Sequence, residues 1–190
     1  MKNILTMLVT VVALFLMSCE NNGTSTTATA AANTTSTTPT SKSTQPAVAK
    51  DKVRVSAKNV TAKSGTEVCI DVQVSNFDEI LSMQYATTWD TKALKFKGPR
   101  NMSLEALTNN NFGKKDTGNG LLRLSWYHPN LKDISLMNGS TIYQLCFDAI
   151  GQSGTTTEVR FGDKRMISEI VNKRNQFFKL DSQPTVVTIE

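Results

Sequence analysis

Histidine is almost absent from this chain of 190 residues, and its scarcity excludes several classes of catalytic site. The single histidine, His128, cannot supply a two-histidine zinc site, and a serine hydrolase triad would depend on it alone. No Gly-x-Ser-x-Gly sequence is present to hold a nucleophile, and the scattered carboxylates suggest neither a glycosidase pair nor a calcium site. We interpret His128 as a loop residue that follows a strand. We therefore predict a protein that is not an enzyme and that uses no metal or cofactor.

Large apolar residues are missing between Glu20 and Ala47, where the chain is mostly Thr, Ser and Ala. Such a segment cannot bury a core, so we predict a disordered linker over residues 19–50. As a flexible coil it would span roughly 30 Å, enough to carry a domain clear of lipid headgroups. A glycosylated stalk is the alternative interpretation of the same composition.

The first residues have the composition of a secretory leader. A basic start at Lys2 precedes the apolar run Ile4–Met17, which is too short to span a bilayer comfortably. The sequence Leu16-Met17-Ser18-Cys19 resembles a bacterial lipobox. It predicts a signal peptide over residues 1–18 and a lipid anchor on Cys19, where acyl chains would hold the protein stably on a membrane. An ordinary signal peptide followed by an accidental cysteine is the alternative. Because Glu20 rather than aspartate follows the cysteine, the resemblance favours the bacterial outer membrane or cell surface.

The net charge of +5 does not indicate nucleic-acid binding. The basic residues occur singly or in pairs, and no basic stripe with interleaved aromatic residues is present. We therefore expect a mildly basic, solvated surface.

The sequence pattern over residues 51–190 predicts one β-rich domain, and this segment is long enough to bury a hydrophobic core. Apolar and polar residues alternate in short runs separated by turn residues, most clearly over residues 68–74, 81–89, 122–127 and 143–149. A small hairpin is expected around Phe177-Phe178, and the one helical candidate is a single turn at Ser103–Leu107. The pattern predicts an all-β, antiparallel β-sandwich.

The order and spacing of these runs resemble the cohesin domain over roughly residues 53–189. The motifs that carry the resemblance are Gly65-Thr66-x-Val68-x-Ile70-x-Val72-x-Val74, Tyr85-x-x-x-Trp89-Asp90-x-x-x-Leu94-x-Phe96, Leu124-Ser125-Trp126 and Leu145-Cys146-Phe147-x-Ala149. The resemblance implies a jelly-roll sandwich of about nine strands, related to carbohydrate-binding modules, and it implies binding rather than catalysis. No Asp-x-Asn-x-Asp-Gly loop of a dockerin is present in the chain itself.

The cohesin resemblance also implies where a partner docks. In cohesins the partner contacts the sheet that holds the third and sixth strands, and Ser82 and Gln84 stand where dockerin-binding members carry Asn and Asp. Carried over to this chain, the outward-facing residues of that surface are Ser82, Gln84, Ala86, Thr88, Arg123, Ser125 and Tyr127. The function that follows is a membrane-anchored module for protein–protein recognition, with a dockerin-like or other protein as partner. Polysaccharide binding is the alternative, and a purely structural surface lipoprotein is a third hypothesis.

The two tryptophans bear on the choice between protein and polysaccharide. Trp89 and Trp126 fall on the apolar side of their strands, so we expect them in the core rather than on a sugar-stacking surface. Tyr127 has the opposite parity and should be exposed. One exposed aromatic side chain does not make the flat strip that binders of crystalline polysaccharide need.

A disulfide between Cys69 and Cys146 is the remaining prediction. Setting the lipidated Cys19 aside leaves an even pair of cysteines, in a compartment where disulfides persist. Both have the outward parity of their strands, and the cohesin-like topology makes those strands neighbours in one sheet. Two unrelated surface thiols are the alternative.

Overall fold

The computed structural model describes residues 50–190, and the predicted signal peptide, lipid anchor and most of the linker lie outside these residues. The described part is built almost wholly of strands: β1 (Lys52–Ser56), β2 (Val60–Ala62), β3 (Glu67–Ser75), β4 (Phe77–Thr88), β5 (Leu94–Arg100), β6 (Phe112–Gly113), β7 (Leu121–Tyr127), β8 (Ile134–Leu136), β9 (Ser140–Ala149), β10 (Thr156–Phe161), β11 (Glu169–Asn172), β12 (Phe177–Ser182) and β13 (Thr185–Ile189). Two 3₁₀ turns, Asn109–Asn111 and Thr117–Asn119, are the only helices in this part, and no helix in it is long and apolar enough to cross a membrane.

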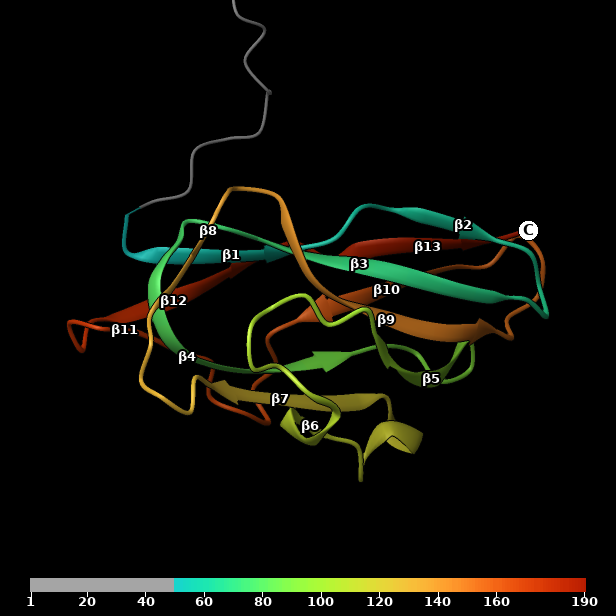
Figure 1. Cartoon of the computed structure of the whole chain (residues 1–190). Coiled ribbons are helices and arrows are strands. Elements are labelled where there is room, and N and C mark those ends of the chain that lie inside the picture. Colours follow the sequence, from blue (N-terminus) through green and yellow to red (C-terminus); the bar gives the residue numbers. More distant parts are fainter. Residues whose placement is uncertain (1–49) are drawn as a thin grey trace, which may run out of the picture. The chain divides into compact units, whose positions relative to one another are not determined.

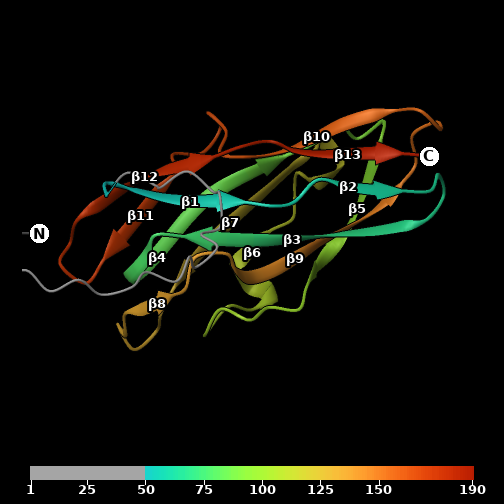
Figure 2. The ribbon, with the colours of Figure 1, turned by 90° about the horizontal axis from the view of Figure 1, so that it is seen from above.

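The strands form two facing layers, as the all-β prediction requires (Figure 1). One layer runs β12–β1–β3–β9–β5, and the other is centred on β4, which pairs with β7 on one side and with β10 and β11 on the other. Because β12 also pairs with β11, the hydrogen-bonded path passes from one layer into the other. Seen from above, β2 and β13 lie side by side at the end that holds the C-terminus (Figure 2).

The structure differs from the expected sandwich in strand number and in two pairings. Thirteen strands replace the expected nine or so, because β2, β6 and β8 are only two or three residues long and are too short to show alternation. The pairings β1–β12 and β2–β13 are parallel rather than antiparallel. Each joins an early strand to a late one, so no hairpin connection forces the two to run in opposite directions.

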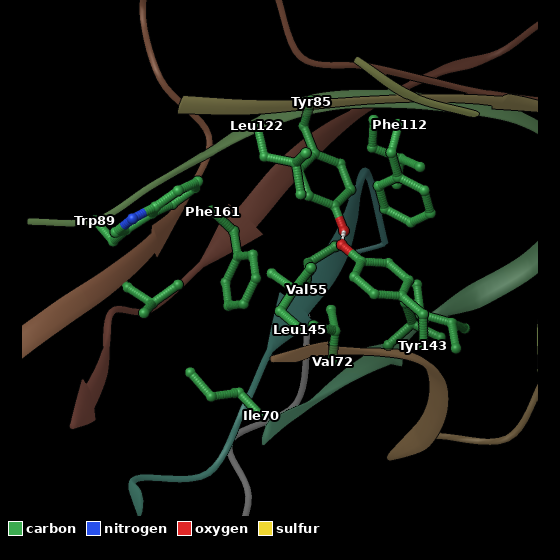
Figure 3. Packing of buried hydrophobic residues seen from close by; sticks show 14 of the residues in the cluster. Val55, Ile70, Val72, Tyr85, Trp89, Phe112, Leu122, Tyr143, Leu145 and Phe161 are labelled. Carbon is green, nitrogen blue, oxygen red and sulfur yellow. Dashed lines mark hydrogen bonds between the residues drawn. The ribbon is translucent and has the colours of Figure 1, made fainter. Parts of the chain in front are cut away.

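The core lies between the layers and contains the alternating residues expected from the sequence (Figure 3). Tyr85 of β4 and Tyr143 of β9 are fully buried and meet there, with their hydroxyl oxygens 2.5 Å apart. Burial raises the pKa of both phenols well above the ordinary value of 10.0. The pair is thus a neutral hydrogen bond that joins the two layers. All described strands and the described core come from residues 52–189, so this part of the chain has a hydrophobic core of its own.

Strand β4 contains an irregularity that the alternating pattern did not predict. The pairing with β11 skips one residue of β4, since Val171 opposes Ser82 whereas Asn172 opposes Ile80. The extra residue is Leu81, which is half-buried, while Ile80 is fully buried in its place. The alternation over residues 81–89 places Leu81 on the core side, and this expectation was wrong because a bulge resets the parity of a strand.

One smaller expectation is wrong and another is confirmed. The helical candidate at Ser103–Leu107 is a β-turn instead: the amide of Leu107 donates to the carbonyl oxygen of Leu104 at 3.0 Å, and the positive φ of Ala106, 61°, does not fit a right-handed helix. Phe177 and Phe178 lie in the hairpin of β11 and β12. The side-chain oxygen of Asn172 holds that turn by accepting from the amides of Arg174 and Gln176 at 2.9 and 3.0 Å.

Candidate binding face

The outward surface of β4 and β7 brings the predicted partner-binding residues together. The register of the antiparallel pair places Ser82 opposite Tyr127, Gln84 opposite Ser125 and Ala86 opposite Arg123. Directly opposed residues of a sheet project from the same side, so these side chains form neighbouring rows. Tyr127 is 62% exposed, as its parity predicts, and Thr88 at the end of β4 is half-buried.

Two of the predicted contact residues differ from the expectation. Ala86 is fully buried, because the segment 162–168 runs beside it: the amide of Gly162 donates to the carbonyl oxygen of Ala86 at 2.7 Å. The same segment accepts from the side-chain amide of Gln84, at 3.4 Å from the carbonyl oxygen of Ile167. Ala86 therefore cannot meet a partner directly. The alternation within β4 could not reveal that Ala86 is covered, because the covering segment 162–168 is distant in the sequence.

Arg123 is the second such residue, since it is half-buried and already paired within the chain. Its guanidinium forms an ion pair with Asp116, and this hydrogen bond lowers the pKa of the Asp116 carboxyl. Arg123 is therefore not a free basic group, and its side chain helps to hold the loop that precedes β7.

Strands β11 and β12 extend the surface on the far side of β4. Val171 lies opposite Ser82, and Phe177 of β12 lies opposite Val171. One row across four strands thus runs from Phe177 through Val171 and Ser82 to Tyr127, and its two aromatic ends are 70% and 62% exposed. We call the outward surface of Ser82, Gln84, Ser125, Tyr127, Glu169, Val171 and Phe177 the binding face. Its β11 and β12 residues were missed because only the fold places that hairpin beside β4.

A small hollow of about 90 Å³ lies within the binding face. Its side-chain lining comes from three strands and includes Ser82, Gln84, Ser125, Tyr127 and Glu169. Glu169 opposes Gln84 in the pairing of β11 with β4. Met83 and Trp126 complete the lining, so the hollow is mixed in character, with polar side chains, one aromatic ring at its side and one carboxylate.

Both tryptophans are buried, as expected, with exposures of 7% for Trp89 and 1% for Trp126. The indole of Trp126 donates to the carbonyl oxygen of Glu105 at 3.0 Å, and Trp89 packs against Phe96 and Phe147. Neither ring can act as a sugar-stacking platform. This finding favours protein recognition over the capture of crystalline polysaccharide.

His128 directly follows β7, as predicted, and its side chain is buried. Its Nε2 lies 3.3 Å from a carboxylate oxygen of Glu105, and the amide of Asn130 donates to its Nδ1 at 3.4 Å. Glu105 also pairs with Lys132, and hydrogen bonds from Lys132 and His128 lower the pKa of this carboxyl. The histidine thus anchors the loop after β7, with both ring nitrogens engaged.

The predicted disulfide is confirmed. Cys69 of β3 and Cys146 of β9 are directly opposed, their Cα atoms are 4.0 Å apart, and their sulfurs are bonded. The only cluster of potential metal ligands in the described part of the chain adds Glu67 to these cysteines. Since the two sulfurs are bonded to each other, they offer no thiolate to a metal.

The fold agrees with that of solved cohesin structures. One is the sixth cohesin of scaffoldin B from Acetivibrio cellulolyticus, solved with a dockerin, which has a TM-score of 0.62 and 17% identity and covers 73% of this chain and 99% of its own. The domain has a cohesin fold. A cohesin–dockerin complex from Clostridium thermocellum has a TM-score of 0.61 and 17% identity, covering 77% of this chain and 98% of its own.

One cohesin neighbour is described as non-cellulosomal. A non-cellulosomal cohesin from the archaeon Archaeoglobus fulgidus has a TM-score of 0.56 and 14% identity, and covers 73% of this chain and 91% of its own. No family model and no curated protein matches the sequence. At these identities the cohesin likeness is a likeness of fold.

Proposed function

We propose that this chain is a non-catalytic, cohesin-like module that recognises a protein partner through the binding face. The observation that carries the proposal is the row from Phe177 to Tyr127, which exposes two aromatic side chains at the ends of a sheet surface whose other side chains are small or polar. Large aromatic residues on a flat surface are typical centres of protein–protein binding energy. Several structural neighbours are cohesins solved in complex with dockerins, which supports a dockerin-like partner.

Partner capture tests this function. The tagged domain of residues 50–190 is expected to retain one protein from extracts of the native envelope, with dockerin modules as defined candidates. The variant Tyr127→Ala with Phe177→Ala should lose this partner, because both ends of the aromatic row are removed. Met137→Ala is the matched control, since Met137 is an exposed apolar residue outside the binding face. Undiminished capture by the double variant would exclude this face.

The contribution of Arg123 is tested separately. The sequence places Arg123 on the partner-binding surface beside Tyr127, but Arg123 is tied to Asp116. We therefore expect Arg123→Ala alone to change affinity little. Polysaccharide binding is the alternative function. Retention of the domain on insoluble glucan or chitin, with no protein partner recovered, would favour that alternative.

We further propose that the module is displayed on the bacterial outer membrane or cell surface by lipid on Cys19. The support is the leader with its lipobox-like end and the linker of Thr, Ser and Ala that follows. Cys19→Ser should move the protein from the membrane fraction to the soluble fraction, because acyl chains supply the anchoring free energy. An unchanged distribution would indicate an ordinary signal peptide instead.

A further inference from the structure

The hollow in the binding face contains an acidic group, Glu169, that has no partner among residues 50–190. Glu169 begins β11 and is half-buried. Among the residues that the structure describes, its carboxylate forms neither an ion pair nor a hydrogen bond. Glu158, in the neighbouring strand β10, is by contrast paired with Arg160. A half-buried carboxylate has lost part of its hydration, so an incoming cation would be attracted to it more strongly than to a fully solvated acid.

The groups around Glu169 can also accept hydrogen bonds from a cationic donor. The side-chain nitrogen of Gln84 donates to the carbonyl oxygen of Ile167, so its amide oxygen is left as an acceptor. The hydroxyls of Ser82 and Ser125 can accept as well, and the exposed ring of Tyr127 stands at the side of the hollow. A ring face attracts a cation placed within about 6 Å of it. The lining thus combines a negative charge, acceptor atoms and an aromatic ring.

The hollow is small and open to solvent. About 90 Å³ of it is available to the centre of a water-sized group, which is room for the end of one side chain but not for a folded segment. Arg123, two positions from Ser125 in β7, is engaged with Asp116 and is not free to fill it.

We infer that this hollow receives a lysine or arginine side chain of the protein partner, with Glu169 as the counter-ion. The inference rests on the proposed function, because it specifies which partner chemistry the binding face selects. Val171 and Phe177 lie on the same face beside the hollow, so they would contact apolar residues next to that basic residue. The partner surface is therefore a basic side chain flanked by apolar ones.

The first test uses a small cationic probe and needs no known partner. N-acetyl-arginine methylamide is titrated into the ¹⁵N-labelled domain of residues 50–190, and amide shifts are followed. Saturable shifts are expected at the residues of the hollow, and Glu169→Gln should weaken binding at least ~10-fold, as loss of a charge-assisted hydrogen bond predicts. Glu158→Gln is the matched control and should leave the titration unchanged. Equal binding by the neutral citrulline analogue, or by Glu169→Gln, would overturn the inference.

The second test separates this inference from the proposed function. The affinity of a captured partner is measured for the wild-type domain, for Glu169→Gln and for Tyr127→Ala with Phe177→Ala. An at least ~10-fold loss in Glu169→Gln supports the inference. If the aromatic double variant loses the partner while Glu169→Gln keeps full affinity, protein recognition by this face stands and the basic-residue site is wrong. If the probe binds through Glu169 but no protein is captured, the site stands and the proposed function is wrong.

Discussion

The outer faces of the two layers differ in how far their polar groups satisfy one another. On the outer face of β3, β9 and β5, Arg100 pairs with Glu67 at 2.6 Å and Gln144 donates to Asp71 at 2.7 Å, around the Cys69–Cys146 disulfide. On the binding face, the hydroxyl of Tyr127 and the carboxylate of Glu169 have no such partners among the described residues. A surface whose charges are already paired gains little from a new partner, whereas unpaired groups beside exposed rings can gain. The comparison supports the proposal that the binding face meets a partner, whereas the paired groups of the other face contribute to the stability of the domain.

The largest expected effect comes from breaking the stabilising face. Replacing Cys69 and Cys146 with alanine should lower the free energy of unfolding by about 2–4 kcal/mol, because the bond closes a long loop between residues separated by 77 positions. Denaturant unfolding, compared with and without reductant, measures this change. The wild-type domain under reductant should resemble the double variant, whose folded fraction should still bind the partner. If the oxidised wild-type domain and the double alanine variant were equally stable, the disulfide would add nothing to the stability of this layer.

A smaller effect is expected where the two layers meet. Tyr85→Phe leaves the buried hydroxyl of Tyr143 without this partner and should cost about 1–3 kcal/mol. Since the double variant Tyr85→Phe with Tyr143→Phe removes both polar groups, it should be less destabilised than the sum of the single variants. Thermal or denaturant unfolding of the wild type, both single variants and the double variant measures the interaction free energy between the two hydroxyls. Strict additivity would mean that the bond does not link the layers.

The same pair predicts a dependence of stability on pH. Burial raises the pKa of both phenols above the ordinary value of 10.0, so the folded state keeps protons that the unfolded state releases. The two protonated phenols contribute fully to the free energy of unfolding below pH 10. This contribution is lost as the pH rises above 10 towards the pKa of the phenols in the folded state. Unfolding curves between pH 8 and pH 12, repeated on the double Tyr→Phe variant, measure this loss. A variant with the same alkaline decline as wild type would assign it to other groups.

The smallest effect on stability is expected on the binding face. Tyr127→Ala and Phe177→Ala remove side chains that are 62% and 70% exposed, so each should change the free energy of unfolding by less than about 0.5 kcal/mol. Affinity for the partner should nevertheless fall at least ~10-fold. Calorimetric unfolding together with binding measurements on the same samples checks both halves of the comparison. A large loss of stability would show that these rings belong to the structure rather than to an interface.

Much of this architecture could be predicted because apolar and polar residues alternate regularly along the longer strands. Val68, Ile70 and Val72 of β3 are all buried, and the outward parity of Cys69 and Cys146 agrees with their bond. The exposure of Tyr127 and the burial of both tryptophans follow from the same rule. The prediction failed where the strands are irregular or very short. The bulge at Leu81 reset the parity of β4, and strands of two or three residues are too short to show a period.

The division between sequence and tertiary structure is clearest at the binding face. The sequence by itself determined which side chains of β7, and of β4 after the bulge at Leu81, point outward, since regular alternation fixes the parity within a strand. Only the tertiary structure decided that Gly162 and its neighbours cover Ala86, that Asp116 engages Arg123, and that Glu169 and Phe177 join the face. These contacts depend on which strands become neighbours and in what register. Packing of the whole core selects that arrangement, and no local pattern encodes it.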